Sequence, residues 1–177
     1  MEVRPAFVRM LCLVAVAVVW SGVVQAQSRE VAVEVFQVPE LPLTVTNVSL
    51  VQTEKGYFLR CSLLSSSELK LVGLRYSLVE IDSEKGIRGL ANRIEGFALE
   101  PYGTKAVKFT VPIKRAPQDG NRLVLMLEQA VARETIWEVI KAKDALDAYA
   151  KGDYSVVPRV LRGPNQVDVP LPGRVSN

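Results

Sequence analysis

The residues from Leu69 to Asp82 form the longest uninterrupted strand-like run of the chain. Its side chains fall into two alternating registers: Val72, Leu74, Tyr76 and Leu78 in one, and Gly73, Arg75, Ser77, Val79 and Ile81 in the other. Because successive side chains of a β-strand point to opposite faces, this alternation predicts a strand with one face against a core. We expect this run to be the central strand of a small β-sandwich.

Six further runs have strand-like character and are separated by turns: Leu43–Val51, Tyr57–Leu64, Ile87–Phe97, Lys105–Val111, Arg122–Ala132 and Thr135–Val139. Short alternating runs at this spacing predict an all-β fold, an Ig-like (fibronectin-type) antiparallel β-sandwich of about seven strands over residues 43–140. The residues of Arg122–Ala132 also form helices readily. We predict a strand there because a turn precedes it and a clearly β-type run follows. Its apolar residues on both faces indicate that something covers its outer face.

The segments that flank the sandwich have different character. Residues 27–42 are predicted to be an N-terminal extended arm, because Pro39 and Pro42 interrupt any ladder. The alternative is a first strand split by a proline kink. Residues 141–152 predict a short amphipathic helix, which would dock on the sandwich and cover Trp137 through Tyr149. Residues 153–177, with four prolines, predict a Pro-rich extended tail.

Residues 1–26 have the order of a secretory signal peptide. Arg4 and Arg9 precede an apolar run, Met10–Trp20, and the small residue Ala26 stands at the expected cleavage site. Met10–Val24 is 15 residues long, shorter than the ~20 that span a bilayer. We therefore predict an exported protein, periplasmic or extracellular, with no transmembrane segment after cleavage. Retention of the run as a membrane anchor is the alternative.

The Leu69–Gly86 pattern is similar to small FxLYD-like domains of exported bacterial proteins. In those domains an alternating strand ends in an acidic residue before a polar glycine turn, and a later turn precedes a strand like Thr104–Val111. Val79–Asp82 occupies the position of the family signature. The resemblance covers Leu43–Val139 and implies a non-catalytic envelope or extracellular module, with no functional residues to carry over.

The chain contains no histidine, which removes histidine-based triads, His-ligated zinc and the commonest general base near neutral pH. Its formal net charge of +3 is too small to indicate a nucleic-acid binder. Lys105, Lys108, Lys114 and Arg115 form a mildly basic run, which we interpret as solvated side chains of a strand edge and loop.

Cys61 alternates with apolar residues, so we predict a buried structural thiol instead of a nucleophile. Glu80, Asp82 and Glu84 could chelate calcium, but they lack the full loop of a calcium motif, and we predict a solvated turn. Asn47-Val48-Ser49 matches a glycosylation sequon. We expect Trp137 to be a core residue; the alternative is a binding platform for a sugar or peptide.

These observations predict an exported, non-catalytic module that binds a protein or is structural in the cell envelope or extracellular space. No catalytic residue, cofactor or metal site is predicted. We expect the partner to be a protein, bound through the tail 153–177, where Val167, Val169 and Leu171 alternate. The alternatives are a carboxylate-based hydrolase and a carbohydrate-binding module, which needs exposed coplanar aromatic side chains.

Overall fold

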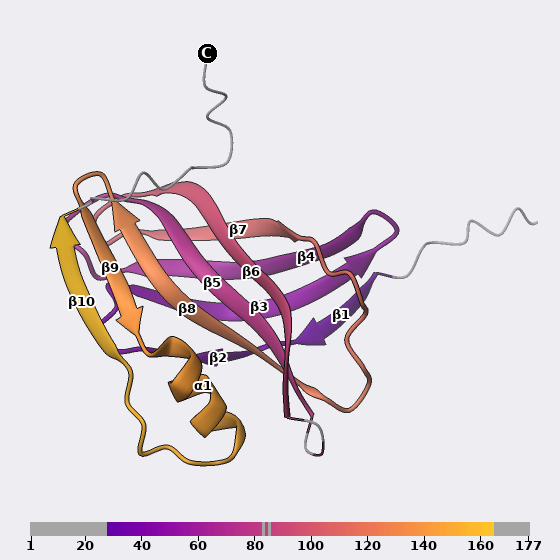
Figure 1. Cartoon of the computed structure of the whole chain (residues 1–177). Helices are drawn as coiled ribbons and strands as arrows, with labels where there is room; N and C mark the ends of the chain where they lie inside the picture. Colours follow the sequence, from indigo (N-terminus) through magenta and orange to yellow (C-terminus); the bar gives the residue numbers. More distant parts are fainter. Residues whose placement is uncertain (1–27, 83, 85, 165–177) are drawn as a thin grey trace, which may run out of the picture.

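The computed structural model describes residues 28–82, 84 and 86–164. The predicted signal peptide and the tail residues from 165 onward, with Val167, Val169 and Leu171, lie outside them. The described part is a two-sheet β-sandwich with one short helix, as predicted for the fold class (Figure 1).

One sheet has four antiparallel strands in the order β1-β3-β4-β7. Their bounds are Arg29–Ala32, Leu43–Thr53, Gly56–Ser65 and Thr104–Val111. The other sheet has the order β10-β9-β8-β5-β6, with β2 pairing parallel to β8. The bounds are Glu34–Phe36 for β2, Leu71–Asp82 for β5, Gly86–Leu99 for β6, Arg122–Ala132 for β8, Thr135–Ile140 for β9 and Arg159–Pro164 for β10.

Strand β5 lies between β6 and β8, which confirms its predicted central place. Leu74, Tyr76 and Leu78 are at most 1% exposed and form the inner face. Val72, predicted to share that face, is half-buried, and Leu71 is buried instead. The pairing register shifts between Leu71 and Gly73, and such an irregularity changes which side chain meets the core.

Strand β8 confirms the strand prediction for Arg122–Ala132. Its inner residues include Leu125 and Leu127, which pair across from Leu78 and Tyr76. Helix α1, Ala142–Ala150, covers part of the outer face, as predicted. Lys141 precedes this helix with a left-handed φ of 57°, and Gly152 follows it with a φ of 76°.

The prediction of an extended arm over residues 27–42 is wrong. Strand β1 pairs with β3 in one sheet, and β2 pairs with β8 in the other, so this segment crosses between the sheets at Val33. Val38 and Leu41 are buried as well. The prolines fall beyond β2, where they remove no ladder hydrogen bond. The free energy gained from burying apolar side chains and pairing the backbone exceeds the conformational entropy lost when the arm is ordered.

The tail prediction is corrected over its first part, because residues 159–164 form β10 along β9. The sandwich therefore continues past residue 140. Without β10, the backbone groups of β9 on that side would have no strand partner, so the pairing satisfies donors and acceptors that a free tail would leave to water.

Candidate functional site

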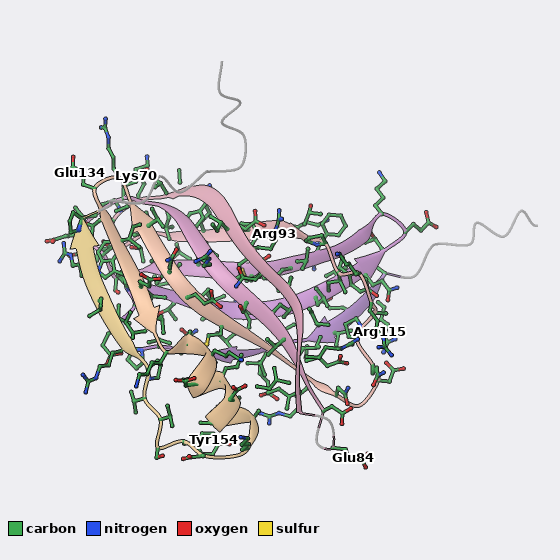
Figure 2. All side chains as sticks on the ribbon, viewed as in Figure 1. Lys70, Glu84, Arg93, Arg115, Glu134 and Tyr154 are labelled. Atoms are coloured by element: carbon green, nitrogen blue, oxygen red, sulfur yellow. The ribbon has the colours of Figure 1, made fainter. Side chains whose placement is uncertain are left out.

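The first candidate site is a hollow beside α1, here called the aromatic cleft. Its volume is about 190 Å³, and it lies between the segment after β2, the helix and the residues that follow the helix. The lining residues are Phe36, Gln37, Pro39, Ala145, Tyr149, Asp153, Tyr154, Val156, Val157 and Pro158. Figure 2 shows Tyr154 at the end of the helix, on the outside of the molecule.

Three aromatic rings form the cleft wall. The ring centroids of Phe36 and Tyr149 are 4.9 Å apart, and those of Tyr149 and Tyr154 are 5.6 Å apart. Tyr154 is nevertheless 70% exposed and Val157 66%. Of the six large hydrophobic side chains that are exposed in the described residues, four lie in residues 154–161. This concentration of exposed apolar side chains makes residues 154–161 a candidate interaction surface.

A glutamate–arginine pair contacts Tyr149, one of the residues that line the aromatic cleft. The Arg122 guanidinium donates to both carboxylate oxygens of Glu34, at 2.9 and 2.6 Å, and the Tyr149 hydroxyl donates to Glu34 at 3.2 Å. The hydrogen bond from Arg122 lowers the pKa of Glu34, whereas burial and the Glu34 charge raise the pKa of Tyr149. These contacts connect β2, β8 and α1 beside the wall of the cleft that Tyr149 forms.

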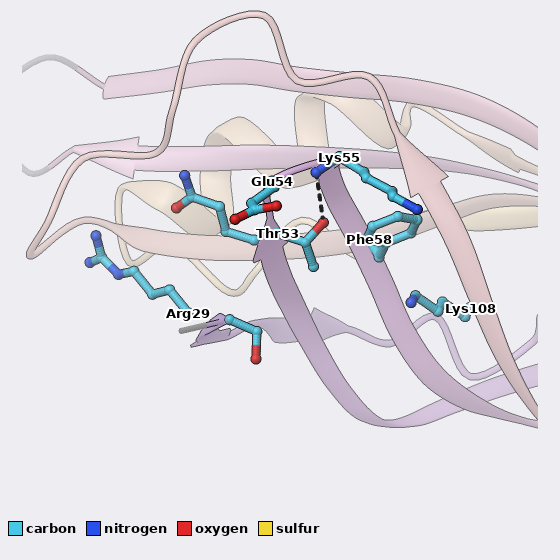
Figure 3. Close-up of a pocket in the computed structure, with 8 residues that line it drawn as sticks. Arg29, Thr53, Glu54, Lys55, Phe58 and Lys108 are labelled. Carbon is cyan, nitrogen blue, oxygen red and sulfur yellow. Dashed lines mark hydrogen bonds between the residues drawn. The ribbon is translucent and has the colours of Figure 1, made fainter. Parts of the chain in front are cut away.

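The second candidate site is an open hollow of about 570 Å³ on the four-stranded sheet, here called the basic cleft (Figure 3). Its lining residues are Ser28, Arg29, Gln52, Thr53, Glu54, Lys55, Phe58 and Lys108. Most of them belong to the hairpin of β3 and β4. The Thr53 hydroxyl shapes the turn, since it accepts the Lys55 N–H and donates to the Gly56 carbonyl, each at 3.2 Å.

The basic cleft includes one residue of the predicted basic run. Lys108 is exposed on β7, with its ammonium 4.0 Å from the centroid of the Phe58 ring. Lys105, Lys114 and Arg115 are exposed too, so the predicted solvation of the run is confirmed. Sequence reasoning missed the cleft because its cations come from β1, the β3–β4 turn and β7, and only pairing of the strands brings them together.

Glu80 is the main correction among the predicted polar residues. It is 1% exposed, not part of a solvated turn, and it extends the inward register of Leu78. Its carboxylate accepts hydrogen bonds from two nitrogens of Arg88, from the Gln118 backbone N–H at 2.5 Å and from the Asn121 amide at 3.0 Å. Burial by itself would raise the pKa of Glu80, but these hydrogen bonds outweigh it and hold the pKa below its ordinary value.

This arrangement separates Glu80 from the other two acids of the calcium hypothesis. Asp82 accepts the Glu84 backbone N–H at 2.9 Å, within the hairpin turn. Within the ranges that the structure describes, no group of three or more acidic, cysteine or histidine side chains has the geometry of a metal site. A sequence signal for burial of Glu80 existed, because Glu80 shares the register of Leu78 and a cation, Arg88, lies opposite it across the hairpin.

Cys61 and Trp137 occupy the predicted core positions, 3% and 7% exposed. Burial raises the pKa of the Cys61 thiol to about 12, which leaves no reactive thiolate near neutral pH. The prediction that Tyr149 covers Trp137 is wrong, because the Tyr149 ring packs on Phe36 and Tyr154. The Arg162 guanidinium from β10 lies over Trp137 instead, 5.2 Å from its ring centroid. Asn47 of the sequon is exposed, at a bulge in β3 where its φ is 52°.

No helix in the described part of the chain is long and apolar enough to cross a membrane. Comparison of the chain with protein-family models, with curated proteins and with solved structures finds no match.

Proposed function

We propose that the protein is an exported, non-catalytic module with an Ig-like fold, which binds a protein partner through the aromatic cleft and the exposed apolar residues beside it. The observation that carries the proposal is the concentration of exposed apolar side chains in residues 154–161, which begins at Tyr154 in the contact of three aromatic rings. Export rests on the signal-peptide pattern of residues 1–26.

The strand order supports an Ig-like topology. The order β3-β4-β7 corresponds to strands A, B and E of that fold, and β9-β8-β5-β6 corresponds to G, F, C and C′. The chain crosses between sheets after β4, β6 and β7, as the Greek-key connections of that fold require. In this assignment β1, β2 and β10 are additions to the fold. Strand β2 supplies Phe36 to the lining of the aromatic cleft, and β10 follows the cleft-lining segment after the helix.

A non-catalytic role fits the state of the reactive side chains. The chain has no histidine, and its cysteine in the described residues is buried with a raised pKa. Glu34 and Glu80 each face an arginine at hydrogen-bonding distance. A carboxylate in such a pair is stabilised as a structural anion and is a poor proton donor near neutral pH.

The partner is expected to contact side chains and not to add a strand. Each outer strand of the two sheets carries cationic side chains, which discourage edge-to-edge pairing. They are Arg29 on β1, Arg88 and Arg93 on β6, Lys105 and Lys108 on β7, and Arg159 and Arg162 on β10. The aromatic cleft instead offers tyrosine and apolar surface, the composition of energetically important interface residues.

Affinity capture with surface variants tests the proposal. Tyr154→Ser combined with Val157→Ser removes the exposed apolar groups and should abolish capture of partners, while the fold survives because both side chains are mostly exposed. Tyr102→Ser is the matched control, since Tyr102 is 68% exposed on a distant turn. Partners that bind the wild type and the control equally, but not the double variant, support the aromatic cleft. Unchanged capture by the double variant would rule it out.

A further inference from the structure

We propose that the basic cleft binds an acidic sugar, a saccharide that carries a carboxylate or a similar anionic group. The proposal is independent of the protein partner, because this cleft lies on the four-stranded sheet and shares no lining residue with the aromatic cleft. Three features carry it: the charge of the lining, the hydrogen-bonding groups among it, and the fixed position of one cation.

The lining has an excess of positive charge. Arg29, Lys55 and Lys108 are its cations, and Glu54 is its single acid. Arg29 pairs with Asp119 across the chain. Lys55 and Lys108 form no ion pair with any residue in the described ranges, so their charges are available to a ligand. Figure 3 shows them on two sides of the Phe58 ring. Convergent unpaired cations in a concave site attract an anion.

The remaining lining groups select the kind of anion. The Ser28 hydroxyl and the Gln52 amide can donate and accept hydrogen bonds, the Glu54 carboxylate can accept them, and Phe58 supplies one apolar ring. A hydrocarbon ligand would leave these polar groups unpaired, at a cost for each. A polyhydroxylated ring satisfies them, and its C–H face can lie on apolar surface. The volume of about 570 Å³ is in the range of small-molecule sites and exceeds the need of a bare ion.

The cleft is also partly preorganised for an anion. The contact between the Lys108 ammonium and the Phe58 ring holds that charge over the sheet, and the Thr53 hydrogen bonds fix the turn that carries Lys55. Groups that are already placed lose less conformational entropy when a ligand binds. Lysine presents a point charge without the planar geometry of arginine, so the site can accept a carboxylate in several orientations.

The test is an NMR titration of the full mature chain with trigalacturonic acid, a trisaccharide with three carboxylates. We expect saturable shifts of the amides between Gln52 and Phe58, weakening as salt rises. Lys55→Gln with Lys108→Gln should reduce affinity by about tenfold or more. Lys143→Gln with Lys151→Gln removes the same charge from exposed positions of the α1 region and should leave affinity unchanged.

Titrations with three further ligands distinguish an acidic sugar from other causes of the amide shifts. Neutral galactotriose should not bind, inorganic phosphate should bind more weakly than the acidic trisaccharide, and vesicles of anionic lipid should not protect the Gln52–Phe58 amides. Phe58→Leu should weaken binding of the trisaccharide more than that of phosphate, because both ligands lose the contact that places Lys108 but only the sugar loses the apolar ring face. Equal loss in both lysine double variants, equal binding of phosphate, or no saturable shift with trigalacturonic acid would each overturn the proposal, whatever the outcome of partner capture.

Discussion

The two clefts differ in where their residues come from. The basic cleft is formed mainly by one hairpin, with single residues from the neighbouring strands. The aromatic cleft joins a loop near residue 37 to a helix and a segment more than 100 residues later. The first is charged and open, whereas the second is apolar and rests on docked elements. Pairing of neighbouring strands brings together the three cations of the basic cleft, from β1, the β3–β4 turn and β7, whereas the apolar surface of the aromatic cleft required three segments distant in sequence to pack together.

Two glutamate–arginine pairs connect elements of the sandwich, and they differ in burial. Glu34 and Arg122, which contact Tyr149 of the aromatic cleft, are each 44% exposed. Glu80 is 1% exposed and accepts hydrogen bonds from the loop of residues 112–121, whose Asp119 pairs with Arg29 of the basic cleft. Solvent screens the first pair, but the second is part of the core. The Glu80–Arg88 pair should therefore contribute much more to stability than the Glu34–Arg122 pair, although both join a glutamate to an arginine.

The largest expected effect is that of Glu80→Ala. The substitution leaves Arg88, the Gln118 N–H and the Asn121 amide without their acceptor, and loss of one partner of a buried pair costs about 3–5 kcal/mol. The free energy of unfolding, measured in urea, should fall by that amount. Amide exchange should rise first in residues 112–121. Glu84→Ala, at an exposed turn position, should change stability by less than about 0.5 kcal/mol. Similar losses in both variants would contradict the buried anchor.

A smaller effect should come from pH. The folded-state pKa of Glu80 is lowered, so its contribution to stability is present above the unfolded pKa and is lost as the pH falls through the folded value. Glu80→Gln cannot titrate. The stability advantage of the wild type over Glu80→Gln should be constant above about pH 5.5 and should shrink below about pH 4.3, the ordinary value for glutamate. An advantage that grew on acidification would mean that Glu80 is protonated in the folded protein.

The smallest effect is expected at the exposed pair. Glu34→Gln keeps the shape of the side chain and removes its charge, and a solvent-screened pair of this kind contributes about 0.5–1 kcal/mol. Urea unfolding should show this loss, together with greater mobility of the Tyr149 ring by NMR. Glu68→Gln, whose partner Arg162 is 3.5 Å away with both side chains mostly exposed, is the control and should have almost no effect. A loss at Glu34 as large as that at Glu80 would remove the distinction between the two pairs.

Several features of this protein were predictable because they depend on neighbours in the sequence. The inward face of β5 from Leu74 to Leu78, the burial of Cys61 and the helix before Gly152 follow from local periodicity and stop signals. The strand assignment of β8 follows from its neighbours, a preceding turn and a following β-type run. The core position of Trp137 could be predicted. Its contact with Arg162 could not, because the sequence did not identify β10 as a strand. The predictions are wrong where a short segment becomes a strand only by pairing with another strand of the sandwich.

The all-β fold and its single helix could be predicted from the sequence, because alternation and turn residues act within a few positions of the chain. Contacts between distant segments are what divide residues 29–36 between two sheets, bury Glu80 against the loop of residues 112–121 and create the two clefts. The physical reason is that strands of three to six residues have little preference of their own. Their pairing, and the burial of a charge or a ring beside them, depends on which distant surface can satisfy their backbone and apolar groups.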